Sequence, residues 1–366
     1  MAMHHGELLV NKLFWKKKKV LITGHTGFKG SWLSLCLQHF GAEVIGISLD
    51  PPTNTSLYEK ANVSEGMTSL RQDIRDLEAV KNIFQLHKPE IVFHMAAQAL
   101  VRYSYLNPVE TYETNVMGTM NILEGIRSIN TVRAAVMVTS DKCYKNKEKD
   151  ECYSENDPMG GHDPYSSSKG AAELLISSYR NSYFPLDSYD EHRTAIASVR
   201  AGNVIGGGDW AKDRLIPDII KAFQNRKKVK IRNPNAVRPW QHVLEPLSGY
   251  IQLAELLSNS GTKYAEAWNF GPIKEDAHSV KWVVEKITEL WGNNASWMID
   301  ESEHPHEANY LKLDCSKAFK RLNWQPKWNL DQALLKIVEW HKVEQTNGKY
   351  KDLCLNQIDE YLSAKG

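Results

Sequence analysis

The chain has 366 residues, with 45 basic and 44 acidic side chains and a net charge of +1. This balance argues against binding nucleic acid or an anionic membrane through overall charge. No apolar stretch approaches the roughly 20 residues of a membrane span, and the first residues lack the apolar region of a secretory signal. The five cysteines are scattered and odd in number, which favours a reducing compartment, so we predict a cytoplasmic protein.

Short β-branched runs alternate with longer amphipathic stretches through the first half of the chain. Strands are predicted at residues 20–23, 43–48, 91–94, 134–139 and 194–199, and helices at 32–40, 77–86, 109–129 and 168–183. This alternation predicts an α/β fold with a doubly wound, Rossmann-like parallel sheet. After about residue 205 the rhythm breaks, which indicates a smaller, mixed C-terminal substrate lobe. We expect a dinucleotide-binding domain over 14–204 with return segments from the C-terminal half, a lobe mainly over 205–345, and a tail over 346–366.

A glycine-rich run, Gly24-His-Thr-Gly-Phe-Lys-Gly30, follows the first predicted strand and leads into an apolar helix. Three glycines spaced three apart leave room for a pyrophosphate to approach the backbone, and the helix N-terminus offers free N–H groups. The run therefore predicts a dinucleotide site, with contacts expected from Gly24, Thr26, Gly27, Phe28, Lys29 and Gly30.

Two aspartates are candidates for cofactor contacts: Asp50 follows the second predicted strand, and Asp73 follows a short run that could form a further strand. Asp50 lies twenty residues beyond Gly30, where a carboxylate accepts hydrogen bonds from a ribose 2′-hydroxyl and repels a 2′-phosphate. This position favours NAD over NADP, although Asp50 also suits a turn before Pro51. Asp73, followed by Ile74, is interpreted either as a contact to the adenine amino group or as a helix N-cap.

Tyr165 and Lys169 lie four residues apart, and therefore on one face of a helix. A free phenol has a pKa of about 10 and is a poor base at neutral pH. A nearby ammonium group lowers that pKa, so Tyr165 is a candidate to remove a proton from a sugar hydroxyl. The alternative is an ordinary surface pair.

Ser140-Asp141-Lys142 follows the strand predicted at 134–139 and should border the same pocket. A hydroxyl, a carboxyl and an amine are more than alcohol oxidation needs. They suit an elimination, in which one group protonates a leaving hydroxyl and another removes a carbon-bound proton. An ordinary turn between strand and helix remains the alternative.

Several further polar residues are candidates for substrate contacts. The arginines suit phosphate groups but are equally typical of a protein surface. The set consists of Gln98, Arg102, Asn203, Arg214, Arg232 and Arg238. His304, His306 and Glu307 are not interpreted as metal ligands, because Pro305 breaks their spacing and no second cluster matches them.

Taken together, these motifs resemble the extended short-chain dehydrogenase/reductase superfamily, and within it the nucleotide-sugar 4,6-dehydratases. The likeness runs from about residue 14 to residue 340. It rests on the glycine run and on Phe93-His-Met-Ala-Ala-Gln98, Glu110-Thr-Tyr-Glu-Thr-Asn-Val-Met-Gly118, Thr139-Ser-Asp-Lys-Cys-Tyr144, Arg200-Ala-Gly-Asn-Val-Ile-Gly-Gly-Gly-Asp-Trp210, Ile231-Arg-Asn-Pro234, Arg238-Pro-Trp-Gln-His-Val-Leu-Glu-Pro246 and His304-Pro-His-Glu-Ala-Asn-Tyr-Leu-Lys-Leu-Asp314. The resemblance adds Ala96, Ala97, Gln98, Asn115 and Thr139 as cofactor contacts and Tyr310 as a substrate contact.

The resemblance implies NAD as a resident cofactor and CDP-glucose as the substrate, because Ser140-Asp141-Lys142 stands where the dTDP-glucose branch carries Thr-Asp-Glu. In the implied reaction Tyr165 removes the C4 hydroxyl proton with help from Lys169 and Ser140. Lys142 then takes the C5 proton, or only orients the sugar, and Asp141 protonates the departing C6 hydroxyl. A 4-keto-6-deoxy sugar for deoxysugar or O-antigen synthesis results.

Three readings remain beside this one. They are a nucleotide-sugar epimerase or reductase, a 4,6-dehydratase acting on another nucleotide hexose, and a non-enzymatic NAD sensor. The resemblance also implies a homo-oligomer, a dimer or tetramer, paired through the helices predicted at 109–129 and 168–183.

Overall fold

The computed structural model describes residues 11–147, 151–292, 294–300, 311–343 and 349–364. The strands are β1 Lys19–Thr23, β2 Glu43–Ser48, β3 Thr68–Arg71, β4 Ile91–His94, β5 Ala134–Val138, β6 Cys152–Tyr153, β7 Ala195–Arg200, β8 Val204–Ile205, β9 Val229–Ile231, β10 Val237–Pro239, β11 Gln241–His242, β12 Ala267–Asn269, β13 Ala277–Ser279, β14 Trp297–Ile299 and β15 Lys312–Leu313.

The α-helices are α1 Lys12–Trp15, α2 Phe28–His39, α3 Leu57–Lys60, α4 Leu77–His87, α5 Val101–Leu106, α6 Pro108–Tyr112, α7 Gly118–Arg127, α8 Pro164–Ser182, α9 Tyr189–His192, α10 Leu215–Gln224, α11 Leu244–Ser260, α12 Val280–Trp291, α13 Ser316–Leu322, α14 Leu330–Lys342 and α15 Tyr350–Ser363. A π-helix, η1 Glu113–Met117, lies between α6 and α7, and the 3-10 turns are η2 Asp141–Cys143, η3 Leu186–Ser188, η4 Gly261–Lys263 and η5 Lys274–Asp276.

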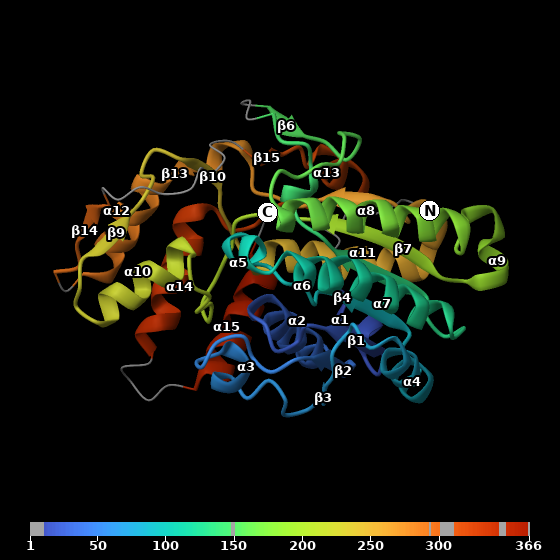
Figure 1. The fold of residues 1–366 in the computed structure, drawn as a ribbon. Coiled ribbons are helices and arrows are strands. Elements are labelled where there is room, and N and C mark those ends of the chain that lie inside the picture. The colour runs from blue at the N-terminus through green and yellow to red at the C-terminus, as the bar shows by residue number, and fades with distance from the viewer. Residues whose placement is uncertain (1–10, 148–150, 293, 301–310, 344–348, 365–366) are drawn as a thin grey trace, which may run out of the picture.

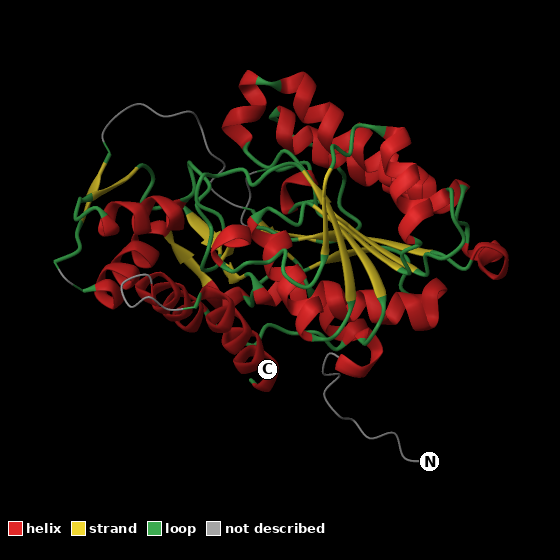
Figure 2. Cartoon of the chain, turned by 90° about the horizontal axis from the view of Figure 1, so that it is seen from below, coloured by secondary structure: helices red, strands yellow, loops and turns green. Residues whose placement is uncertain are grey.

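A seven-stranded sheet in the order β12-β7-β5-β4-β1-β2-β3 forms the centre of the molecule. Each neighbouring pair is parallel, with Val20 of β1 opposite Ile91 of β4. Figure 2 shows helices on both faces of this twisted sheet. The predicted doubly wound α/β fold is confirmed. The short edge strand β12 had no clear sequence signal and returns from the C-terminal half.

Alternate residues of the strands face two different apolar clusters, because side chains alternate between the faces of a sheet. Val20 and Ile22 of β1 pack with α2, α11 and α15 on one face, whereas Leu21 packs with α4, α7 and α8 on the other. Burial on both faces explains why these strands are continuous apolar runs. The sheet is therefore a rigid platform whose carboxyl edge carries the polar loops.

Three predicted helices differ from the observed ones at their ends or inside. Helix α2 begins at Phe28, four residues before the predicted start. Helix α8 begins at Pro164, because the Asp163 side chain accepts a hydrogen bond from the backbone N–H of Ser166 and proline suits the first helical position. The single helix predicted at 109–129 is divided into α6, η1 and α7, and such π-helical turns are frequent at functional sites.

The C-terminal half contributes a third apolar cluster, formed by α10, α12, α14 and β9. Figure 1 shows these elements together at the left end of the molecule, away from the main sheet. The segment expected to be a tail contains α15, which packs against α2 and α14. Within the described ranges, no helix is long and apolar enough to cross a membrane.

Candidate active site

The glycine run forms a tight turn between β1 and α2. Gly24 has φ +77°, and a Cβ there would lie 2.8 Å from the backbone nitrogen of Ala96. A Cβ on Gly30 would lie 2.1 Å from the Gly24 carbonyl oxygen, so only glycine allows the helix to start this close to the strand. Gly27 is the N-cap of α2 and has no side-chain cap. The open helix N-terminus and the bare turn fit a pyrophosphate.

Asp50, beyond the carboxyl end of β2, is exposed and accepts a 2.8 Å hydrogen bond from Arg71 Nε at the end of β3. Arg71 was not foreseen from the sequence. Its guanidinium also stacks on Tyr58, 5.0 Å from the ring centroid. Thr26 donates hydrogen bonds toward the same strand end, to the carbonyl oxygen of Leu49 at 3.0 Å. The Asp50 carboxylate, which we expected to meet a ribose, is therefore oriented by a hydrogen bond from Arg71.

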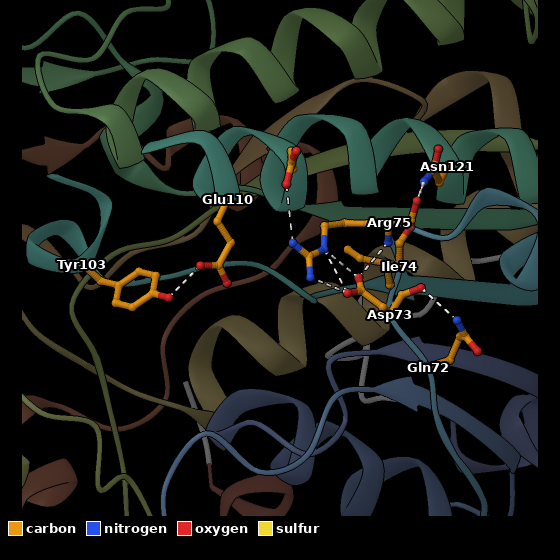
Figure 3. A network of polar contacts seen from close by, with 8 residues as sticks. Gln72, Asp73, Ile74, Arg75, Tyr103, Glu110 and Asn121 are labelled. Atoms are coloured by element: carbon orange, nitrogen blue, oxygen red, sulfur yellow. Dashed lines mark hydrogen bonds and ion pairs between the residues drawn. The ribbon is translucent and has the colours of Figure 1, made fainter. Parts of the chain in front are cut away.

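Asp73 lies in the loop after β3, and Figure 3 shows its carboxylate facing Arg75. Arg75 donates through Nη2 at 2.6 Å and through Nε at 2.9 Å, and these hydrogen bonds lower the pKa of Asp73. The N-cap of α4 is Asp76, not Asp73, so the alternative reading of Asp73 as a cap is excluded. Ile74 is buried, and its carbonyl oxygen accepts a hydrogen bond from Asn121 Nδ2 at 2.9 Å.

Asn115 braces the loop after β4 against α8. Its Oδ1 accepts from the backbone N–H of Gln98 at 2.8 Å, and its Nδ2 donates to the Gln98 carbonyl oxygen at 3.0 Å and to Ser168 Oγ at 2.8 Å. Asn115 is buried within η1. It therefore fixes the residue beside Lys169 instead of opening toward a ligand.

The loop that contains Ala96 and Ala97 is also tied to β1, because the backbone N–H of Ala96 donates to Thr23 Oγ1 at 3.0 Å. The side chain of Gln98 turns inward, where its Nε2 donates to Thr111 Oγ1 at 3.0 Å. The backbone of this loop lies against the glycine turn at Gly24, but the Gln98 side-chain amide is hydrogen-bonded within the protein.

Ser140, Asp141 and Tyr165 form a buried polar cluster at the carboxyl end of β5. Ser140 Oγ donates to Asp141 Oδ1 at 2.9 Å, and Ser140 also hydrogen-bonds Tyr165. A Cβ on Gly202 would lie 1.9 Å from Asp141 Oδ2, so the chain after β7 closes directly over this carboxylate. The structure thus brings three of the five predicted catalytic residues together.

Tyr165 and Lys169 are both buried on α8. The expected lowering of the Tyr165 pKa is not seen, because burial raises it to about 12 while the hydrogen bond with Ser140 opposes that rise. Burial also lowers the pKa of Lys169 to about 8, although the charge of Glu173 raises it. In the protein alone, removal of the phenol from water outweighs the help from nearby cations.

Lys29 is partly buried beside this cluster. Burial and the positive charges of Lys169 and Arg214 lower its pKa to about 7. Its Nζ lies 3.4 Å from the Tyr250 hydroxyl. The other predicted catalytic amine, Lys142, is exposed, so it lacks the burial that the role of a neutral base calls for.

Sequence reasoning missed a buried ion pair beneath the cluster. Arg200 Nη2 lies 2.7 Å from Glu173 Oε2, and both side chains are buried. Thr139 Oγ1 donates to the same carboxylate at 2.5 Å, so its hydroxyl faces the interior and not an open site. The sequence held a hint of this ion pair. Glu173 lies one helical turn beyond Lys169, and Arg200 is the first residue of the motif that ends at Trp210.

The candidates in the C-terminal half are dispersed. Arg214 caps α10 and pairs with Asp209 at 3.0 Å, close enough for its charge to lower the pKa of Tyr165. Arg102 and Arg232 instead meet at Asp213, at 3.3 and 3.8 Å. Three other candidates are placed elsewhere: Asn203 follows β7 with φ +49°, Arg238 lies on β10, and Tyr310, with His304, His306 and Glu307, lies outside the described residues.

A cavity of about 350 Å³ opens beside Asp141. It is lined from both halves of the chain, by Cys152 and Gly202, by residues 239, 241 and 271–273, by 275 and 277, and by 312–316 and 319. A buried polar cluster at the carboxyl edge of a parallel sheet, next to a cavity and an open glycine turn, is the arrangement expected for a dinucleotide-dependent enzyme acting on a small ligand.

A family model described as GDP-mannose 4,6 dehydratase matches residues 21–337. The chain therefore belongs to the GDP-mannose 4,6 dehydratase family, and the resemblance to nucleotide-sugar dehydratases is confirmed. Among curated proteins it is 56% identical to the CDP-glucose 4,6-dehydratase of Salmonella typhimurium, over 97% of this chain and 99% of that protein. It is 26% identical to the dTDP-glucose 4,6-dehydratase of Haemophilus influenzae, over 88% and 97%.

Solved structures support the fold. A dTDP-glucose 4,6-dehydratase of Bacillus anthracis, in complex with NAD, has a TM-score of 0.72 at 22% identity, covering 92% of this chain and 99% of that one. An epimerase of Methanothermobacter thermautotrophicus has a TM-score of 0.77 at 23% identity, covering 92% and 95%.

Proposed function

We propose that this protein is a hydro-lyase that converts CDP-D-glucose to CDP-4-dehydro-6-deoxy-D-glucose with NAD as a resident cofactor. The observation that carries the reaction type is the buried cluster of Ser140, Asp141 and Tyr165 beside the glycine turn. The choice of nucleotide is supported by the 56% identity, along nearly the whole chain, to a CDP-glucose 4,6-dehydratase.

The cofactor site fits NAD in this proposal. The pyrophosphate would lie at the N-terminus of α2, the ribose near Asp50, and the adenine near Asp73 and Ile74. When bound, NAD would supply the acceptor for the C4 hydride and the donor of a hydride to C6. Residues 14–204 would hold the cofactor and residues 205–345 mainly the nucleotide sugar, with β12 as a return segment.

The chain's own residues would move the protons. Tyr165 takes the proton of the C4 hydroxyl, and the positive charge of a bound nicotinamide would bring its pKa down from about 12. Asp141 protonates the C6 hydroxyl as it leaves, so it must carry a proton at that step. Lys142 takes the C5 proton and later returns it. Unlike Tyr165 and Asp141, Lys142 is exposed in the protein alone.

One experiment addresses substrate and reaction together. The protein is incubated with CDP-, dTDP-, UDP- and GDP-glucose, and the 4-keto-6-deoxy product is measured. We expect CDP-glucose to be preferred, and preference for another nucleotide would overturn the assignment. The wild-type product should carry solvent deuterium at C5, and loss of product formation in K142Q would support Lys142 as the base.

An epimerase needs Tyr165 and Lys169 but not Asp141. Asp141→Asn should therefore stop dehydration, with the exposed Asp187→Asn as its control. Full activity of the Asp141 variant would favour the epimerase reading.

The proposal includes a second copy of the chain as partner. Exposed apolar side chains lie on α5, α6, η1 and α8, which pack against one another. They are Tyr103, Tyr105, Leu106, Val109, Tyr112, Met117 and Leu174. Burying such a patch would favour a homodimer. A double substitution, L106K/V109K, should shift the mass measured by light scattering to that of a monomer.

A cytoplasmic setting in deoxysugar or O-antigen synthesis completes the proposal. All five cysteines are free thiols, as suits a reducing compartment. We expect that deleting the gene for this protein removes a deoxysugar from the lipopolysaccharide of the strain.

A further inference from the structure

A second pocket, of about 470 Å³, lies between α5, α10 and β9, and no predicted catalytic residue lines it. Six cationic and three anionic side chains line it, an excess of three positive charges in a chain with a net charge of +1. The cations are Arg102, Lys221, Lys227, Lys228, Lys230 and Arg232, and the anions are Asp213, Asp218 and Asp300.

The arginines account for two of the carboxylates. Asp213 lies 3.3 Å from Arg102 and 3.8 Å from Arg232, and Asp218 lies 4.0 Å from Arg232. Arg102 donates a hydrogen bond to Asp213, whereas both contacts of Arg232 are long, so the Arg232 guanidinium is only loosely paired.

The four lysines are left with their charge available. All four are exposed, and none forms an ion pair with any residue that the structure describes. Arg102 adds a partly exposed guanidinium to this wall of the pocket.

The pocket adjoins the catalytic cluster. Ser104, two residues after Arg102 on α5, accepts a 3.1 Å hydrogen bond from the backbone N–H of Tyr165. On the other side, Asp213 is followed by Arg214, whose charge acts on Lys29 and Tyr165. Figure 1 shows α10 and β9 on the side of α5 that faces the C-terminal elements.

We propose that this basic pocket binds a diphosphate or triphosphate group at a site separate from the catalytic residues. Exposed lysines are flexible point charges, which suits rapid, salt-sensitive capture of an anion more than rigid recognition. The anion has two possible sources: the diphosphate of an incoming nucleotide sugar, which rests on the proposed function, or a free nucleotide or inorganic polyphosphate, which does not.

Calorimetry with inorganic pyrophosphate tests the site without turnover. The titration is made at low ionic strength, with saturating CDP present to fill the nucleotide site. Three proteins are compared: the wild type, K227Q/K228Q/K230Q, and K16Q/K17Q/K19Q, which loses the same charge at the opposite edge of the sheet, where β1 begins. We expect about tenfold weaker binding in the first variant, since each exposed pair contributes roughly 0.2–1 kcal/mol, and unchanged binding in the second. Equal affinity in all three proteins overturns the proposal.

Kinetics then identify the source of the anion. If the substrate's diphosphate is captured, K227Q/K228Q/K230Q should have kcat/KM for CDP-glucose reduced about fivefold at low ionic strength, and the deficit should vanish at high salt. A calorimetric loss with no kinetic loss assigns the pocket to a free polyphosphate. If the wild type turns over no nucleotide sugar, the proposed function fails while calorimetry still decides the pocket.

Discussion

Two buried glutamates, in different regions of the molecule, have pKa values displaced in opposite directions. Glu173 lies under the buried cluster of Ser140, Asp141 and Tyr165, where burial raises its pKa but Arg200 at 2.7 Å lowers it below its usual value. Glu245 lies on α11, under the C-terminal helix, and burial raises its pKa to about 7. Both side chains are almost inaccessible to solvent.

The difference lies in what donates to each carboxylate. Glu173 receives a guanidinium and two hydroxyls, from Arg200, Thr139 and Ser198. Glu245 receives the Tyr361 hydroxyl at 2.6 Å and two backbone N–H groups, which carry no full charge. Equal burial thus fixes one glutamate as an anion beside the active site and leaves the other close to its titration point where α15 docks.

The largest expected effect comes from breaking the charged pair. Glu173→Gln keeps the shape but leaves the Arg200 guanidinium buried without its counter-charge, which costs about 3–5 kcal/mol. Urea denaturation at neutral pH measures the loss. Asp190→Asn is the control, because its pair with Arg193 is exposed and should contribute less than about 1 kcal/mol. Equal, small losses in both variants would show that the buried pair is dispensable.

The second effect is a pH dependence of stability that Glu245 imposes. Its folded pKa of about 7 lies above the ordinary 4.5, so the stability it contributes is complete below pH 4.5 and lost as pH rises through 7. The loss amounts to about 3 kcal/mol. Glu245→Gln should remove that part of the slope of unfolding free energy against pH. Glu255, also raised to about 7, produces a similar slope and remains in the variant as an internal reference.

The sequence predicted the Rossmann-like half well because its strands are buried on both faces and so read as continuous apolar runs. The glycine turn was equally readable, since Gly24 and Gly30 are required by backbone contacts that no other residue permits. The edge strand β12 was harder to predict from the sequence. It has only three residues, and its pairing with β7 depends on contacts across more than sixty positions.

The site was predicted as a set of residue types, not as an electrostatic environment. Ser140, Asp141 and Tyr165 do converge, but the sign of the Tyr165 shift depends on desolvation, which no local spacing reveals. The exposure of Lys142 and the inward turn of Gln98 are likewise consequences of tertiary packing. Glu173 and Glu245 look alike in sequence because their donors come from distant segments.

A smaller effect sharpens the comparison at Glu245. Tyr361→Phe removes the hydroxyl whose hydrogen bond lowers the Glu245 pKa, so the titration midpoint should move upward. The expected loss of stability is about 1 kcal/mol and is larger above pH 7 than below pH 5, where the carboxyl is protonated. Tyr183→Phe, at an exposed position, is the control. A loss that is the same at both pH values would show that the hydroxyl does not act through Glu245.

The smallest effect on stability concerns a third carboxylate, Asp73, which has the guanidinium pairing of Glu173 but lies at the surface. Arg75 holds it at 2.6 Å, with both side chains about one-third exposed. Arg75→Gln should therefore cost less than about 1 kcal/mol of stability, because exposed pairs are screened by solvent. If Asp73 meets the adenine, the same change should weaken NAD binding about fivefold through loss of the carboxylate's orientation, as measured by fluorescence titration. Arg127→Gln, which breaks an exposed pair with Glu124, should leave NAD affinity unchanged. An unchanged affinity in the Arg75 variant would mean that the Arg75–Asp73 pair only stabilises its loop. Arg75 would then have the same purely structural role at the surface that Arg200 has in the core.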